Sequence, residues 1–239
     1  MLLAIDTSTR YAGVALVNDE GQLVQLLHWR SPQNHTVELM PAIELVLSRG
    51  QTTLWDLAGI AVALGPGSFS ALRVGVGLAK GLAWSTGVPL VTATSLETEA
   101  FGYRATGATV CAVLDAVRSQ VAWALFDDTN GRLRQTTTEQ ISDPAEISAS
   151  LPTPVLVCGE GLERHADAIL SAVGHEVRLA LPYLPAQRVA ALGFLGMERL
   201  QAGAVADTRT TQPLYVRRPT IAERGQRPAS TPPSQGQPT

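Results

Sequence analysis

The 239-residue chain has few cysteines, few aromatic residues and no long hydrophobic run. No stretch of about 18 apolar residues occurs, so the sequence predicts no membrane-spanning helix. The N-terminal segment M-L-L-A-I-D meets a charge at Asp6, too early for the apolar core of a secretory signal peptide. From these absences we expect a cytoplasmic protein.

The charge balance and the cysteines argue against two further kinds of site. A formal net charge of −3 argues against a broad nucleic-acid surface on this chain alone, although RNA contact within a complex stays open. The two cysteines, Cys111 and Cys158, lie in apolar runs without a metal-ligating neighbour at two-residue spacing. We predict that both are buried, reduced thiols.

Two stretches of the chain repeat one pattern. Residues 3–23 and 112–133 each read as an apolar strand ending in Asp, a polar turn, a second apolar strand, an Asp/Asn/Gly turn and a third strand. The strand-ending aspartates, Asp6 and Asp115, lie 109 residues apart. A period this long does not fit a solenoid. It predicts two related lobes, with a cleft between them where a ligand would bind.

The order of the expected elements gives the fold class. We expect a first lobe over residues 1–106 and a second over residues 107–184, where Asp143-Pro144 opens a short helix. Three strands, a helix, a strand and a helix, written twice, form an α/β arrangement with mixed sheets. The unit resembles the RNase H-like half of the actin/sugar-kinase/Hsp70 (ASKHA) superfamily. Residues 185–224 are expected to form a C-terminal helix and an extension packing back on the body, and residues 225–239 a disordered tail.

The first candidate site is the turn Asp6-Thr7-Ser8-Thr9. An Asp at the carboxyl end of a strand, followed by hydroxyl residues, can hold a hydrated cation and phosphate oxygens. The superfamily resemblance implies that this turn and the one at Asp115 face nucleotide phosphates and their metal. The alternative is a turn satisfied by its own backbone. Phosphate-binding members usually carry a glycine here, whereas this chain has Ser8 and Thr9.

The second candidate is the glycine-rich segment over residues 65–81. Gly65 and Gly67 permit unusual backbone angles, and Ser68 is an expected N-cap that leaves helix amides free for an anion. The segment is not a Walker A loop, because no Gly-Lys-Ser/Thr closes it. Three glycines within the following helix each weaken it by about 1 kcal/mol relative to alanine. They indicate close packing against a neighbour in this chain or in a partner. These glycines are Gly75, Gly77 and Gly81.

The third candidate is His35, at the start of an expected helix. The position that would complete an H-x-x-x-H metal pair is Leu39, so we expect no metal there. No nucleophile lies near a base in the sequence, although sequence distance does not exclude a spatial triad. Gly159-Glu160-Gly161 reads either as an adenosine-lining segment or as a plain strand-to-helix turn.

A set of motifs, in order, carries a family resemblance. They are L-A-I-D-T-S-T, N-H-T-V-E-L-M-P-A-I, G-P-G-S-F-S-A-L-R-V-G-V-G-L-A-K-G-L-A, L-D-A-V-R and P-L-Y-V-R-R-P. Together they resemble the bacterial TsaB (YeaZ) family from residue 1 to about residue 223, and the G-P-G-S-F block is the most specific part. The family more often has S-F-T-G-L-R where this chain has S-F-S-A-L-R, so Ala71 replaces a glycine.

The resemblance implies a scaffold without a catalytic or metal site of its own. Such a subunit supports threonylcarbamoyl transfer to N6 of adenosine 37 in tRNAs reading codons that start with A. It dimerises with a TsaD-like transferase through helices 36–48 and 68–84, a TsaE-like ATPase binds the pair, and tRNA is met only through the complex. The implied partner-interface residues are His35, Leu39, Ile43, Val46, Leu72, Arg73, Val76, Gly77 and Lys80.

Several alternatives stay open at this point. An adenine nucleotide with Mg²⁺ at the partner interface is one. Residues that would face it are Asp6, Thr7, Ser8, Gly65, Gly67, Ser68 and Asp115. Another is an active ATP-dependent kinase or a metal-dependent, glycopeptidase-like hydrolase of the same superfamily. A third is a homodimer that pairs the same helices.

Overall fold

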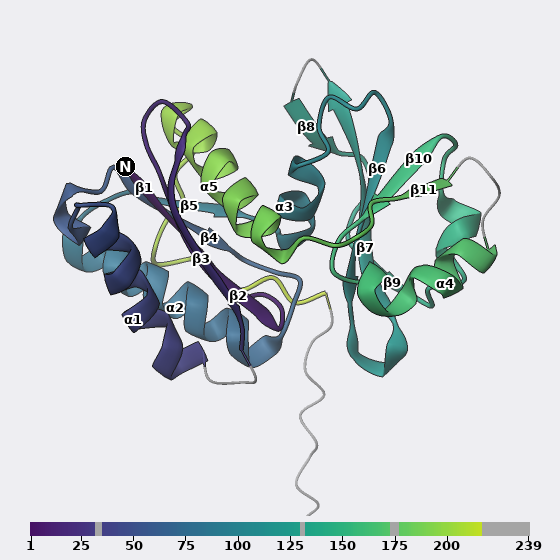
Figure 1. Ribbon diagram of the computed structural model, residues 1–239, viewed down its shortest axis with the longest axis horizontal. Helices are drawn as coiled ribbons and strands as arrows, with labels where there is room; N and C mark the ends of the chain where they lie inside the picture. The colour runs from purple at the N-terminus through teal and green to yellow at the C-terminus, as the bar shows by residue number, and fades with distance from the viewer. Residues whose placement is uncertain (32–34, 130–131, 173–176, 217–239) are drawn as a thin grey trace, which may run out of the picture.

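The computed structural model describes residues 1–31, 35–129, 132–172 and 177–216, and the chain folds into two lobes standing side by side (Figure 1). The tail expected over residues 225–239 lies outside the described residues, as does the end of the expected C-terminal extension.

The first lobe is built on a five-stranded mixed sheet in the order β3-β2-β1-β4-β5. β2 pairs antiparallel with β1 and β3, whereas β4 pairs parallel with β1 and β5. Hydrogen bonds between Asn18 and Gln22 close the hairpin turn after β2. The strands are β1 (Leu2–Asp6), β2 (Tyr11–Val17), β3 (Leu23–Arg30), β4 (Gly59–Ala63) and β5 (Leu90–Ala93).

The second lobe repeats this order and these directions as β8-β7-β6-β10-β11, and β9 pairs with the first half of β7. The strands are β6 (Thr109–Asp115), β7 (Val121–Thr129), β8 (Arg132–Gln135), β9 (Gln140–Ser142), β10 (Val155–Cys158) and β11 (Val177–Leu179). β1 and β6 are matching central strands, and each ends in its aspartate. The duplicated pattern therefore predicted two related sheets correctly.

Helices separate and cover the sheets (Figure 1). α1 and α2 pack on one face of the first sheet, α5 packs on its other face, α3 lies between α5 and the second sheet, and α4 covers the far face of the second sheet. None of the helices in the described ranges is long and apolar enough to span a bilayer. The helices are α1 (His35–Arg49), α2 (Phe69–Thr86), α3 (Ser95–Phe101), α4 (Leu162–Ala172) and α5 (Pro185–Gln201), with 3-10 turns η1 (Leu54–Asp56), η2 (Val117–Ser119) and η3 (Ile147–Ser150).

The short helix expected to begin at Asp143-Pro144 does not form. Asp143 instead caps a tight turn, in which it accepts hydrogen bonds from the amides of Ala145 and Glu146. Only the short η3 turn follows before β10. The position that α1 occupies in the first lobe is thus filled by a single 3-10 turn in the second.

Candidate functional site

A cleft of about 1070 Å³ opens between the lobes, at the carboxyl ends of β1 and β6. It brings together four of the seven residues expected to face a nucleotide. These are Ser8, Gly67, Ser68 and Asp115. Further lining comes from Arg10, Phe69, Arg118, Glu160, Arg164 and Tyr215. The two aspartate-ended turns, distant in sequence, therefore meet across one cleft.

Asp6 does not face this cleft. Its side chain is 0 % exposed, and Arg188 from the first turn of α5 donates through Nε to Asp6 Oδ2 at 2.6 Å. The amide and hydroxyl of Ser8 donate to Oδ1 at 2.8 and 2.7 Å. Both carboxylate oxygens are occupied by groups of the chain itself. The expectation that Asp6 presents its oxygens to phosphate or metal is therefore wrong.

The glycine turn before α2 is docked on the β1–β2 turn. The Ser68 amide donates to the Ser8 carbonyl at 2.8 Å, and a Cβ added at Gly67 would lie 2.0 Å from that carbonyl oxygen. Gly67 is thus required for close approach of two backbone segments. Ser68 is the N-cap residue, but its side chain makes no capping hydrogen bond to the described residues. Gly65 is buried behind the turn, with φ +112°.

Gly75 explains one of the three helix glycines. A Cβ at this position would lie 2.3 Å from Thr7 Oγ1, and that hydroxyl donates to the Ala71 carbonyl at 2.7 Å. Thr7 is buried beneath α2, away from the cleft lining, so its expected role facing phosphate is also wrong. The missing side chain lets α2 lie directly on the β1–β2 turn.

Asp115 lines the cleft but is paired within its own lobe. Arg164 Nη1 donates to its Oδ2, and His165 Nε2 lies at hydrogen-bond distance from its Oδ1, both at 2.8 Å. Partial burial alone would raise the pKa of Asp115, but the contacts with His165 and Arg164 lower it below its usual value. This carboxylate is charged and already has the guanidinium of Arg164 as a cationic neighbour.

Ion pairs join the lobes beside the cleft. Arg10 Nη2 lies 3.0 Å from Glu160 Oε1 and 2.8 Å from Glu163 Oε2, and the Tyr11 hydroxyl donates to Glu163 at 3.0 Å. Glu160 belongs to the turn between β10 and α4 and also lines the cleft, so both interpretations of Gly159-Glu160-Gly161 stay open.

The cysteines and His35 are buried. Cys111 and Cys158 lie in the core as unpaired thiols, as predicted, and burial raises the pKa of both. Burial lowers the pKa of His35. Within the described residues, no group of three or more His, Cys, Asp or Glu side chains could hold a metal ion.

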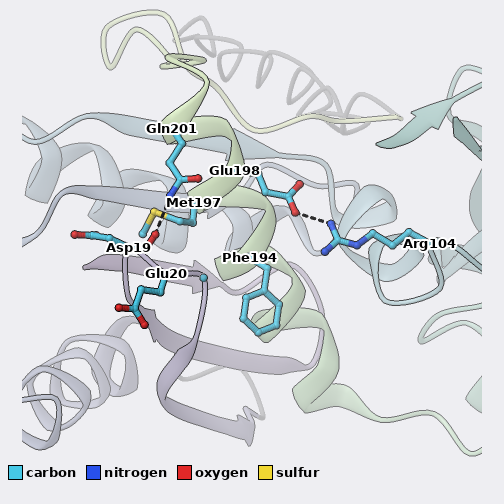
Figure 2. A pocket seen from close by; sticks show the side chains of 8 residues that line it. Asp19, Glu20, Arg104, Phe194, Met197, Glu198 and Gln201 are labelled. Atoms are coloured by element: carbon cyan, nitrogen blue, oxygen red, sulfur yellow. Dashed lines mark hydrogen bonds and ion pairs between the residues drawn. The ribbon is translucent and has the colours of Figure 1, made fainter. Parts of the chain in front are cut away.

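A second hollow, of about 270 Å³, lies between the β2–β3 turn and the C-terminal half of α5 (Figure 2). Its polar groups are largely paired: Arg104 donates to Glu198 at 2.6 Å, and Gln201 donates to the Asp19 carbonyl at 2.9 Å. Phe194 and Met197 supply its apolar part. No motif in the sequence predicted this hollow.

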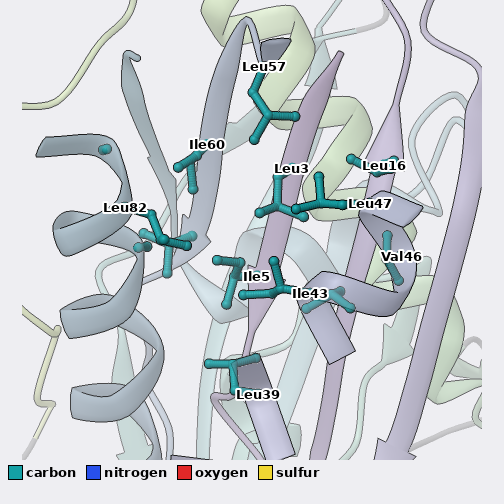
Figure 3. Packing of buried hydrophobic residues seen from close by; sticks show 14 of the residues in the cluster. Leu3, Ile5, Leu16, Leu39, Ile43, Val46, Leu47, Leu57, Ile60 and Leu82 are labelled. Carbon is teal, nitrogen blue, oxygen red and sulfur yellow. The ribbon is translucent and has the colours of Figure 1, made fainter. Parts of the chain in front are cut away.

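The apolar stripe of α1 lies in the core. Leu39, Ile43 and Val46 pack against Leu3, Ile5 and Leu16 of the first sheet (Figure 3). Their assignment to a partner surface is therefore wrong, and it is wrong for Leu72 and Val76 of α2 as well, because both are buried. α1 has one strongly apolar stripe, and that stripe packs against the sheet of its own lobe.

The remaining interface candidates divide between the interior and the surface. His35 is buried, and Lys80 is half-buried, with its Nζ donating to the Thr211 carbonyl at 2.8 Å. Arg73 and Gly77 lie on the exposed face of α2. The sequence analysis missed the apolar neighbours on the exposed faces of α1 and α2, which are Val37, Leu45, Phe69 and Trp84.

The two lobes and their cleft define an actin-like α/β fold. A solved ROK family glucokinase from Streptomyces griseus, in complex with glucose and AMPPNP, superposes with a TM-score of 0.51. At 9% identity it covers 82% of this chain and 99% of that chain, which shows the shared fold alone.

Sequence comparison narrows this class. A family model described as TsaD, tRNA N6-adenosine threonylcarbamoyltransferase, matches residues 30–221. The tRNA threonylcarbamoyladenosine biosynthesis protein TsaB of Bacillus subtilis (strain 168) is 33% identical over 219 residues, which are 90% of this chain and 93% of that protein. The structure of YeaZ from Pseudomonas aeruginosa matches with a TM-score of 0.75 at 26% identity, covering 90% of this chain and 99% of that one. The chain belongs to the TsaB (YeaZ) family of tRNA threonylcarbamoyladenosine biosynthesis proteins, and the resemblance read from its motifs is confirmed.

Proposed function

We propose that this protein is a non-catalytic subunit that supports threonylcarbamoyl transfer to adenosine 37 of tRNA by pairing with a TsaD-like transferase. The observation that carries the proposal is the buried Asp6–Arg188 ion pair. A kinase or metal-dependent hydrolase would need a metal ion near the strand-ending aspartate. Here the guanidinium of Arg188 occupies the position beside Asp6 and pairs with the carboxylate that would bind such an ion. Family membership supports the pathway, and it also supports recruitment of a TsaE-like ATPase to the pair.

The exposed face of α2 has a shape suited to another helix. Gly77 and Gly81 are four residues apart and so lie on one face. Apart from the adjoining residues and the nearby backbone of α2 itself, no described atom lies within 4 Å of a Cβ added at either position. Phe69 and Trp84, the latter 84% exposed, stand near the two ends of the helix. Small residues between large ones let a partner helix approach closely while aromatic side chains pack beside it.

Part of the proposal concerns a nucleotide. Phe69 lies both in the cleft lining and on the exposed face of α2, so an adenine nucleotide with Mg²⁺ would bind where the cleft meets the partner. Calorimetry with Mg-ATP, with and without the transferase, tests this part. Heat of binding only in the presence of the transferase supports it. Tight binding and turnover by the chain alone would instead support the enzyme alternative.

Gly77→Leu tests the interface. Leucine favours the helix by up to about 1 kcal/mol relative to glycine, so the isolated chain should keep or gain stability. The bulky side chain should hold the partner helix away and weaken binding to the transferase, measured by size exclusion and calorimetry. Ser171→Leu, at an exposed position of α4, is the matched control and should leave binding intact.

Activity is the decisive readout. Transfer to tRNA in a reconstituted system should require the parent chain, persist with Ser171→Leu and fall with Gly77→Leu. Full transfer without the chain, or undiminished binding by Gly77→Leu, would refute the proposal. A homodimer that persists under excess transferase would favour the self-association alternative.

A further inference from the structure

Arg188 is a buried arginine, 2% exposed, that lies beneath the cleft lining. Its partner Asp6 also accepts a hydrogen bond from Ser8, which lines the cleft, and we call this buried position the base of the cleft. Besides Asp6, its guanidinium donates to Glu99 Oε1 at 3.3 Å, to the Tyr183 hydroxyl at 3.4 Å and to the Tyr11 carbonyl at 2.8 Å. Its partners come from β1, β2, α3 and the segment before α5. One side chain thus joins four separate segments of the chain.

The buried carboxylate of Asp6 requires a cation at this place, and the carboxyl group of Glu99 lies beside the same guanidinium. Asp6 and Glu99 are both buried, and an isolated ionised carboxylate in the interior is strongly unfavourable. A divalent ion such as Mg²⁺ needs several oxygen ligands free to turn toward it. The Asp6 oxygens already accept three hydrogen bonds, and a second cation beside the guanidinium would be repelled. The residues present therefore do not fit a metal ion next to Asp6.

Glu99 carries the contact onward to the second lobe. Its Oε1 also accepts a hydrogen bond from the Glu160 amide at 3.3 Å. Glu160 in turn accepts from the Asp115 amide at 3.2 Å and pairs with Arg10. A continuous chain of ion pairs and backbone-amide hydrogen bonds thus runs from the aspartate that ends β1 to the aspartate that ends β6.

We propose that Arg188 is a built-in cation that takes the place of a divalent ion at the base of the cleft and holds the two lobes at one fixed angle. Asp6 and Glu99 are its two anchors, and Glu160 passes the constraint to the second lobe. The assignment concerns this chain alone and does not depend on the proposed transferase partner.

The lobe angle can be measured directly by electron–electron double resonance. Because both native cysteines are buried, nitroxide labels can be placed at Ser48→Cys on α1 and Ser171→Cys on α4, both exposed positions. The parent chain should give one narrow distance distribution. Arg188→Ala should broaden it, and added methylguanidinium should restore it. Arg199→Ala, which removes an arginine paired with Glu97 further along the same helix, is the matched control and should leave the distribution narrow.

The metal part is tested with Mn²⁺ alone as the probe, followed by its own paramagnetic resonance signal. The parent should show no saturable Mn²⁺ site at Asp6. The Arg188→Ala variant should gain one that disappears on adding Asp6→Asn. A parent site that Asp6→Asn abolishes, or a folded Arg188→Ala variant without Mn²⁺ binding, would overturn the ion-position assignment.

An Arg188→Ala variant that cannot fold is replaced by a neutral triple variant. Arg188→Met, Asp6→Asn and Glu99→Gln together remove all three charges and leave no carboxylate unpaired. A folded triple variant with a broadened distance distribution supports the proposal that Arg188 holds the two lobes at one fixed angle. An unchanged narrow distribution, in this variant or in Arg188→Ala, would overturn it.

Discussion

The two glycines at positions 75 and 77 give a sharp test of how α2 is placed. Both stand in one helix, so alanine at either should gain about 1 kcal/mol of helix propensity. Gly77 faces open space, and we expect Gly77→Ala to raise the free energy of unfolding by up to about 1 kcal/mol. At Gly75 the new Cβ would lie 2.3 Å from Thr7 Oγ1 and 3.3 Å from Thr7 Cβ, so the threonine must move.

The cost of Gly75→Ala has two parts. Overpacking of a filled site costs about 1–3 kcal/mol, and losing the hydrogen bond from Thr7 to the Ala71 carbonyl costs about 1 kcal/mol. After the propensity gain, the variant should be destabilised by about 1–3 kcal/mol. Urea unfolding followed by circular dichroism measures both variants.

Adding Thr7→Ala provides the control, because it removes the atom that the new methyl group meets. Thr7→Ala with Gly75→Ala should be more stable than the sum of the single changes, whereas Thr7→Ala with Gly77→Ala should be additive. Equal stability changes for the two single glycine variants would refute the placement of α2 on the β1–β2 turn.

The remaining expectations concern the two faces of α1 and the buried carboxyl group of Glu99. Leu39→Ala should lower the free energy of unfolding by about 2–5 kcal/mol, because it opens a cavity against the first sheet. Val37→Ser, at an exposed position, should change stability little and weaken transferase binding. Unfolding experiments and calorimetry measure both variants. If Leu39→Ala weakened binding at unchanged stability, and Val37→Ser lowered stability without affecting binding, the stripe of Leu39, Ile43 and Val46 would be the interface after all. Burial raises the pKa of Glu99 to about 7, with the negative charge of Asp6 adding to the shift and Arg188 and the Tyr183 hydroxyl opposing it. The folded state then holds a proton that the unfolded state has lost, so this group's contribution to stability declines as pH rises from about 4.5 to 7. Glu99→Gln should remove that decline, so the stability difference between variant and parent should shift in favour of the variant across this range. Urea unfolding at several pH values measures it, and a pH-independent difference would count against the raised pKa.

The fold could be predicted well because its signals are local or repeated. Matching strand patterns around Asp6 and Asp115 predicted two related lobes with mixed sheets. The apolar period foretold α1 and α2 to within two residues at each end. These signals depend on neighbours in sequence, which is why they survive without knowledge of the tertiary structure.

The site was harder to predict for two physical reasons. Periodicity shows that Leu39, Ile43 and Val46 share a face but not what covers it, and a helix beside a sheet buries its apolar face there first. Arg188 and Asp6 are 182 residues apart in the sequence, so no local motif could predict their ion pair. The sequence shows only that an arginine stands at the start of a helix that is otherwise apolar over two full turns.

The glycines of α2 shape both sides of the helix. On the inner side, Gly75 lets the helix rest on Thr7, directly after Asp6 in the chain. On the outer side, Gly77 and Gly81 leave the helix backbone open to a partner. A partner helix on that face would therefore lie about one helix diameter, roughly 10 Å, from the turn that follows the ion pair. Because Arg188 already neutralises Asp6 there, a partner would meet a surface whose geometry needs no ion, and in the absence of nucleotide its binding to that surface should not depend on added Mg²⁺.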